Sequence, residues 1–247
     1  MTRNARNIAL GAIGLGLAGA LLAVLYLLRP PAEASAPIES IPLAVATSTP
    51  LPEDEIAATE DPGAESEIPQ GVTIYTISQA ESEAQFAIGE TLRGQRTTAV
   101  GVTNQVAGEI AVDLANPAAA QVGAILINAR TLATDSEQRN RAIRNFILDT
   151  GAYEFITFTP AAINGLPETA AVGDTLAVAI TGNLTIRDIT AEVTFTGNVT
   201  VVSPTRLEGS LTATVLRSAY ELVIPSVPQV ADVDDEVVLT ITFVAEG

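Results

Sequence analysis

Apolar and small polar residues alternate along residues 72–247, and this period of two constrains the fold more than any other feature of the sequence. In residues 176–186, for example, Leu176, Val178, Ile180, Leu184 and Ile186 share one face, and alanine, threonine and asparagine share the other. The same alternation recurs in residues 106–113, 192–196, 207–215 and 237–243. Burial on one face only is typical of antiparallel sheets. The pattern therefore predicts an all-β domain over residues 72–247.

One segment, residues 135–150, departs from this alternation. It is charged, and its apolar residues fall at helical spacing, at Ala142, Ile143, Phe146 and Ile147. Thr134 or Asp135 could cap such a helix, because Glu137 and Gln138 follow within the first turn. We therefore expect one helix inserted among about eight antiparallel strands. Eight such strands can close into a barrel that holds side chains or one small ligand.

The N-terminal residues 1–29 contain an uncharged apolar run, Ile8–Leu28, that would span roughly 30 Å as a helix. Arg3 and Arg6 precede the run and an acidic segment follows it, which places the N-terminus in the cytoplasm and the rest outside. The sequence predicts a single-pass anchor in the cytoplasmic membrane with an extracytoplasmic domain. Cleavage as a signal peptide near Ala34 or Ala36 is the alternative, and it would give a secreted protein.

Residues 30–71 have the composition of a disordered linker. They contain eight prolines, nine acidic residues and no basic residue, without a helical or strand period. We expect a self-repelling spacer with a reach of roughly 35 Å between the membrane and the domain.

Composition excludes much chemistry. The net charge is -17 and there is no lysine, so a nucleic-acid partner is not expected. There is no cysteine, so no thiolate can act as a nucleophile or a metal ligand. There is no histidine either, so the commonest general base and the commonest metal ligand are missing. The carboxylates of Asp232, Asp234, Asp235 and Glu236 fit a solvated turn better than a calcium site, since their spacing matches no EF-hand. We expect no enzyme, cofactor or metal; a hydrolase that uses carboxylates alone is the remaining catalytic alternative.

Two arginines follow expected strands. Arg187 lies in a tight turn after Ile186, and Arg217 follows the alternating segment 207–215. Each could form an ion pair with a nearby acidic residue such as Asp188 or Asp149. The alternative for Arg217 is that it faces the polar end of a ligand at the mouth of the barrel.

Four segments together resemble the YceI-like family. The residues GNLTIRDIT at 182–190 resemble its G-x-L-T-I-R-G-V-T hairpin. Residues 75–86 resemble its first strand pair, residues 128–158 its long connection with a helix, and residues 217–220 with 230–246 its closing segment. The sequence departs from the family pattern at Asn140, Glu154, Asp188 and Ala219.

The resemblance implies an extended lipocalin-like barrel that binds a long apolar lipid in its lumen without catalysis. The ligand would be an isoprenoid, a quinone-like molecule or a fatty-acyl chain. A structural or partner-binding surface domain with a solid core is the alternative. The residues that we expect to contact the ligand are Phe86, Val106, Ile110, Ile125, Ile127, Phe146, Ile147, Phe155, Phe158, Leu184, Phe195, Leu211, Val215, Arg217 and Tyr220.

Overall fold

The computed structural model describes residues 30–35, 37–43, 71–226 and 230–247. Its strands are β1 (Thr73–Ile77), β2 (Glu83–Leu92), β3 (Gln95–Thr103), β4 (Val106–Ala107), β5 (Glu109–Val112), β6 (Gln121–Val122), β7 (Ile125–Asn128), β8 (Phe155–Asn164), β9 (Thr175–Ile186), β10 (Ile189–Ser203), β11 (Arg206–Leu216), β12 (Val230–Ala231) and β13 (Glu236–Glu246). The helical elements are α2 (Glu137–Ala142), a π-helical turn η3 (Ile143–Ile147) and the 3₁₀ turns η1 (Pro117–Ala119), η2 (Ala129–Thr131) and η4 (Arg217–Tyr220).

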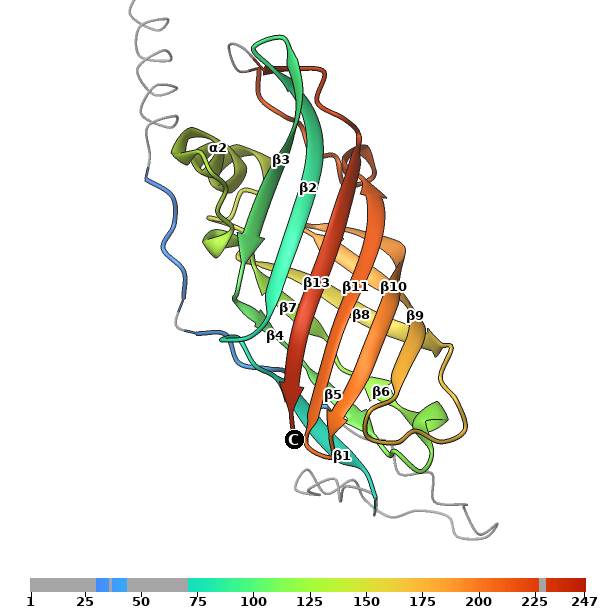
Figure 1. The fold of residues 1–247 in the computed structure, drawn as a ribbon. Helices are drawn as coiled ribbons and strands as arrows, with labels where there is room; N and C mark the ends of the chain where they lie inside the picture. Colours follow the sequence, from blue (N-terminus) through green and yellow to red (C-terminus); the bar gives the residue numbers. More distant parts are fainter. Residues whose placement is uncertain (1–29, 36, 44–70, 227–229) are drawn as a thin grey trace, which may run out of the picture.

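All thirteen strands belong to one antiparallel sheet that curls into a half-barrel (Figure 1). The central order is β7-β8-β9-β10-β11-β13, and β13 then pairs with β2 along Val237–Thr242 and with β1 at Ala245–Glu246. The expected all-β antiparallel fold with one inserted helix is confirmed. The strand number exceeds the expected eight because several segments are interrupted.

The interruption at Gly108 shows how the sheet curls. We expected one strand over residues 106–113, but the chain bends there, so that β4 pairs with β7 while β5 pairs with β1 and β6. Residues 106–112 thus connect the two distant ends of the strand order. A Cβ atom at position 108 would lie 2.4 Å from Cδ1 of Ile125, so a larger residue here would require the Ile125 side chain to shift.

The helical segment lies where the sequence placed it, but its details differ. Ser136 caps α2 by accepting a hydrogen bond from the Arg139 amide at 3.4 Å, whereas Thr134 or Asp135 was expected. Thr134 instead donates to the side chain of Asn140, which is buried. After one and a half turns the helix widens into η3, which places Ile143 and Ile147 towards the sheet. No helix in the described ranges is long and apolar enough to span a bilayer.

We call the end with α2, η4 and the β2–β3 and β9–β10 turns the upper end, as it lies in Figure 1. The lower end holds the β10–β11 turn and the C-terminus. Between them, the inward faces of the strands form one core in which Phe158 and Phe195 pack edge to face, with centroids 5.0 Å apart. This arrangement matches the geometry that aromatic pairs prefer.

Residues 30–35 and 37–43, which we call the strap, lie along the outside of the half-barrel (Figure 1). Both the amide and the hydroxyl of Ser35 donate to the Glu154 carboxylate at 2.7 Å. Further along, Ile38 is buried, and Ser40 and the Leu43 amide donate to Glu109 at 2.9 and 2.8 Å.

The strap differs from the disordered spacer that we expected for residues 30–71. Composition indicated only that this segment cannot form a core of its own. It does not need one, because the half-barrel supplies the carboxylates and the apolar surface against which it packs. The expectations for residues 1–29, including the membrane anchor, and for residues 44–70 lie outside the described residues.

We predict that acid releases the upper part of the strap. Burial alone would raise the pKa of Glu154, but hydrogen bonds from Ser35 and the charge of Arg130 outweigh burial and lower this pKa below its ordinary value. A lowered folded-state pKa stabilises docking above the free value of about 4.3. That contribution disappears as the pH falls through the lowered folded value.

A fluorophore on an Ala34→Cys variant of the full chain measures this release by its anisotropy, since the chain contains no other cysteine. We expect anisotropy to fall below about pH 4.3 in the parent chain. With Glu154→Gln added, we expect low anisotropy already at neutral pH and no such transition. An unchanged anisotropy in the Gln variant would show that Glu154 does not hold the strap.

Candidate functional site

The lower half of the half-barrel encloses a cavity of about 100 Å³ with no polar side chain in its lining. The strands alternate, so the inward residues in the lower parts of β9, β10, β11 and β13 face this space. Its wall includes Leu176, Val178, Ile180, Phe195, Val199, Val201, Leu207, Leu211, Ile241 and Phe243. Such a wall can bury hydrocarbon but offers no group for catalysis.

A second cavity of about 150 Å³ lies in the upper half. Phe86, Ile88, Ala99, Val215, Val237 and Leu239 contribute to it from the sheet, and Ile143, Ile147 and Leu148 close it from the helical segment. Four polar side chains reach its lining: Glu90, Arg139, Arg217 and Tyr220. The upper cavity is therefore apolar with one polar region at the mouth.

The two cavities follow one another along the strands. On β13, Val237 and Leu239 line the upper cavity, while Ile241 and Phe243 line the lower one. On β9 the two inward positions Gly182 and Leu184 lie between the two linings, and on β11 the single inward residue Ala213 does. Each cavity is several times larger than the roughly 10–15 Å³ that a single enclosed water requires.

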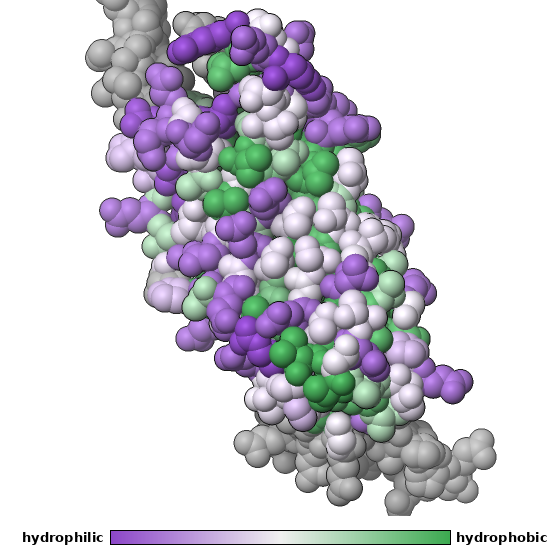
Figure 2. Space-filling view, in the orientation of Figure 1, coloured by the Kyte–Doolittle hydropathy of each residue, from purple (hydrophilic) through white to green (hydrophobic). Residues whose placement is uncertain are grey.

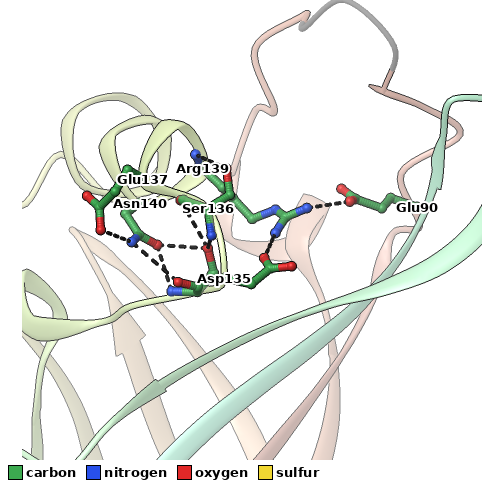
Figure 3. Close-up of polar contacts among 7 residues, drawn as sticks. Glu90, Asp135, Ser136, Glu137, Arg139 and Asn140 are labelled. Carbon is green, nitrogen blue, oxygen red and sulfur yellow. Dashed lines mark hydrogen bonds and ion pairs between the residues drawn. The ribbon is translucent and has the colours of Figure 1, made fainter.

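A partly buried ion pair, Arg139–Glu90, lies at the polar region of the upper cavity (Figure 3). The Arg139 guanidinium donates to Glu90 Oε1 at 2.6 Å and to Asp135 Oδ1 at 2.5 Å. Glu90 comes from β2 and is only 5% exposed, so this pair joins α2 to the sheet across the mouth. A partly buried, hydrogen-bonded pair of this kind can orient the polar end of a bound molecule.

Tyr220 is the most unusual polar residue of the site. It is 1% exposed, and its hydroxyl has no hydrogen-bond partner among the described residues. Burial raises the pKa of Tyr220, so the hydroxyl is neutral at physiological pH. A buried hydroxyl without a partner is costly, which makes it a candidate for a hydrogen bond to a ligand or to water.

We predict that Tyr220→Phe separates ligand binding from folding. Removing a buried hydroxyl that lacks a protein partner should leave the free energy of unfolding of the empty protein unchanged or raise it by about 1 kcal/mol. If the hydroxyl meets a ligand's polar end, affinity should fall by about three- to tenfold, the equivalent of one hydrogen bond. Urea unfolding and ligand titration of the same variant measure the two effects. Unaltered affinity would exclude Tyr220 from the polar subsite.

Arg217 and the acidic cluster mainly build the loop at the mouth. Arg217 Nε donates to the Asp234 carbonyl at 3.0 Å and its Nη1 to the Leu222 carbonyl at 3.1 Å, while Asp235 lies 3.8 Å away. Asp235 binds the Ser218 hydroxyl at 2.5 Å, and this bond lowers the pKa of Asp235. Within the described ranges no group of three or more acidic side chains is placed to hold a metal ion.

Arg187 does not form the ion pair considered from the sequence. In the part of the chain that the structure describes, its guanidinium lies 6.0 Å from the centroid of the Tyr153 ring, and its Nε has no hydrogen-bond partner. The turn after β9 sets this geometry, because Arg187 has a positive φ of 59°. Asp188 is the next residue in the sequence, but the direction of the Arg187 side chain depends on the turn and could not be inferred from that proximity.

The structure brings most of the fifteen expected ligand residues to the lumen. Ile110, Ile125, Phe158, Phe195 and Leu211 line the lower cavity, and Phe86, Ile147, Val215, Arg217 and Tyr220 line the upper one. Val106, Ile127 and Leu184 are buried in the core without lining either. Contact of any of them with a ligand stays a prediction.

Two expected residues lie elsewhere. Phe155 is 37% exposed, because it stands three positions before Phe158 in β8, and residues an odd number apart face opposite sides of a strand. Phe146 lies in an outer groove with Leu92 and Val230, because η3 turns Ile143 and Ile147 inward instead. Both phenylalanines therefore lie away from the two cavities that most of the other expected residues line.

The sequence reasoning missed Glu90 and Arg139 as site residues. Both are charged, and nothing local distinguishes them from solvated residues, since their pairing joins positions far apart in the chain. It also left out Ile143, Val237 and Leu239. These three could have been found, because they fall on the helical and alternating faces already recognised.

Comparisons with known proteins agree with this architecture. Residues 75–245 match the YceI-like domain family. A polyisoprenoid-binding domain from Saccharophagus degradans, implicated in plant cell wall breakdown, is 16% identical with a TM-score of 0.57, over 70% of this chain and 98% of that one. BcnA of Burkholderia cenocepacia is 20% identical with a TM-score of 0.53, over 68% and 98%. At these identities the two structures establish the fold alone. Comparison with curated protein sequences gives no match.

Proposed function

The chain belongs to the YceI-like family, and from this premise we propose that its half-barrel binds the hydrophobic chain of a lipid. The family is one of binding proteins that are not known as enzymes. The relative from Saccharophagus degradans is a polyisoprenoid-binding domain, which supports an isoprenoid, quinone-like or fatty-acyl ligand here. No nucleic acid or cofactor enters this proposal.

The observation that carries the proposal is the pair of successive apolar cavities with polar side chains only at the upper one. A lipid chain has the same distribution, with one polar end and a long apolar remainder. Each methylene moved from water into such a lumen contributes about 0.8 kcal/mol. In this arrangement the tail lies in the lower cavity, and the head lies near Arg139 and Tyr220.

We further propose that residues 1–29 anchor the protein in the cytoplasmic membrane, with the domain outside the cytoplasm. The uncharged run 8–28, the two arginines that precede it and the acidic segment that follows it support this topology. If a signal peptidase removes the run, the same domain becomes a secreted carrier. N-terminal sequencing of membrane and soluble fractions distinguishes the two forms.

A structural or partner-binding domain with a solid core is the alternative. The cavities argue against a core that is packed throughout. Leu184 and Ala213 nevertheless stand between the two linings, so a long ligand requires this layer to move. The alternative therefore predicts that the cavities never take up a chain.

Native mass spectrometry of the full chain released from detergent micelles tests the proposal. Lipids at the surface leave at low activation, whereas an enclosed chain survives it. We expect one retained lipid per protein, which organic extraction and mass spectrometry then identify. A chain without such an adduct, and without uptake of palmitic acid or a polyprenyl alcohol, would support the structural alternative.

A further inference from the structure

The strap fixes which end of the domain lies nearest to the apolar run. Its first residues lie beside Arg130, Arg141 and Arg144 at the α2 end, and Arg130 donates to the Glu33 carbonyl at 3.0 Å. The Glu154 carboxylate, which also pairs with Arg130 at 2.8 Å, holds Ser35. The described chain thus begins at α2, next to the polar region of the upper cavity.

Very little chain separates this point from the proposed anchor. Leu28, the last residue of the apolar run, precedes Glu33 by five positions. A fully extended chain covers about 3.3–3.6 Å per residue, so the two are at most about 18 Å apart. A headgroup layer alone is roughly 5–8 Å thick. If the run spans a bilayer, the α2 end must therefore lie at or close to the headgroups.

The expected long spacer between membrane and domain is absent from this arrangement. Leu43, at the end of the strap, is held by Glu109 of β5, and Gly71 lies beside Asp113 just beyond β5. Residues 44–70 therefore connect two points of the same domain. Their length does not set the distance between the domain and the membrane.

The charges of the domain are also distributed unevenly along its axis. Of the nine arginines in the described residues, only Arg206 belongs to the lower end. The other eight are in the upper half, at positions 93, 96, 130, 139, 141, 144, 187 and 217. Arg141 is exposed and has no ion pair among the described residues. Acidic residues outnumber basic ones at both ends, but the arginines make the upper end the less negative of the two, so of the two ends it suits a bilayer surface better.

Apolar side chains are exposed at the same end. Val223 is 74% exposed in the loop after η4, and Leu92 is 37% exposed at the β2–β3 turn. In Figure 2 the top of the face in view is mostly purple and hydrophilic with a few green hydrophobic side chains, and a larger green group lies towards the lower end. Mixed arginine and aliphatic side chains are suited to the interface between water and lipid.

We propose that the α2 end of the half-barrel is a membrane-docking surface, held against a phospholipid bilayer by the strap. This inference rests on the proposed anchor and deepens the proposed lipid binding. A lipid would then pass between the bilayer and the upper cavity without crossing bulk water. The acidic lower end would point away from the membrane.

Single-cysteine labels test this orientation cleanly, because the chain has no cysteine of its own. The full chain is reconstituted into vesicles of phosphatidylcholine and phosphatidylglycerol that contain a lipid with a spin-labelled headgroup. A fluorophore is placed at Gln138→Cys on α2 or at Val223→Cys. Val172→Cys in the lower half is the matched control, since Val172 and Val223 are both exposed valines, at 53% and 74%.

We expect headgroup quenching at the two upper positions to exceed that at position 172 by at least threefold. Glu154→Ala combined with Glu109→Ala should release the strap and remove most of this difference. Glu83→Ala changes an exposed residue without an ion pair among the described residues and should preserve the difference in quenching.

Equal quenching at all positions, stronger quenching at position 172, or a chain that does not stay on the vesicles would each overturn the proposal. Lipid retention in native mass spectrometry is independent of orientation, so failure of docking and failure of lipid binding are distinguishable.

Discussion

Replacing Ala99 by phenylalanine should abolish most lipid binding and leave the fold intact. Ala99 is 3% exposed in β3 and faces the upper cavity of about 150 Å³. The added phenyl ring occupies space that a ligand chain would otherwise fill. If it displaces three to five methylenes at about 0.8 kcal/mol each, binding weakens by about 2–4 kcal/mol, or roughly 30-fold or more.

The neighbouring residue provides the control for this experiment. Val100 follows Ala99 in β3, faces outward and is 40% exposed, so Val100→Phe adds a ring at the same level of the sheet but outside the lumen. Occupancy by palmitic acid in native mass spectrometry should fall in the Ala99 variant and stay unchanged in the Val100 variant. Overpacking a core without a void costs about 1–3 kcal/mol of stability. Strong destabilisation by Ala99→Phe with unaltered occupancy would mean that the upper cavity is not the ligand site.

The second large effect is that of Phe195→Ala on the free energy of unfolding. Phe195 is 3% exposed and packs edge to face on Phe158 between β8 and β10. Phe195→Ala should lower the free energy of unfolding by about 3–5 kcal/mol, a large part of the roughly 5–15 kcal/mol that stabilises a typical domain. Urea unfolding followed by circular dichroism measures this loss.

A double-mutant cycle with Phe158→Ala isolates the contact between the two rings. We expect a coupling energy of about 0.5–1.5 kcal/mol, the usual contribution of an aromatic pair beyond its buried area. Ile163→Ala, a partly buried residue of β8 that also lines the lower cavity, serves as a control without the ring contact. A loss below about 1 kcal/mol for Phe195→Ala would contradict its place in the core.

Alternation allowed much of the fold to be predicted from the sequence. In residues 176–186 and 207–215, the apolar face expected from the alternation is the buried face of β9 and β11. Once one face of a strand is buried, the period of two determines which side chains point inward. The break at Gly108 was not predicted, since a glycine that continues the alternation of its neighbours looks like a strand residue. Its role becomes evident only through the close approach of Ile125.

The candidate site was predictable in its apolar part and much less in its polar part. Residues such as Phe195 and Leu211 follow from the inward faces of strands. Arg139 and Glu90 meet only in the folded chain, where their ion pair joins α2 to β2, and no local pattern encodes that pairing. The strap was missed for the same reason, because its partners Glu109 and Glu154 lie far along the chain.

Photoaffinity mapping tests the central claim, that the half-barrel encloses a lipid chain, most directly. The full chain in vesicles is exposed to a fatty acid with a diazirine near the end of its tail, and the labelled residues are identified by peptide mass spectrometry. We predict labels on inward residues of the lower half, such as Leu211 and Ile241, and their loss in the Ala99→Phe variant. Labels confined to residues 8–28 and to outward-facing side chains would contradict the account.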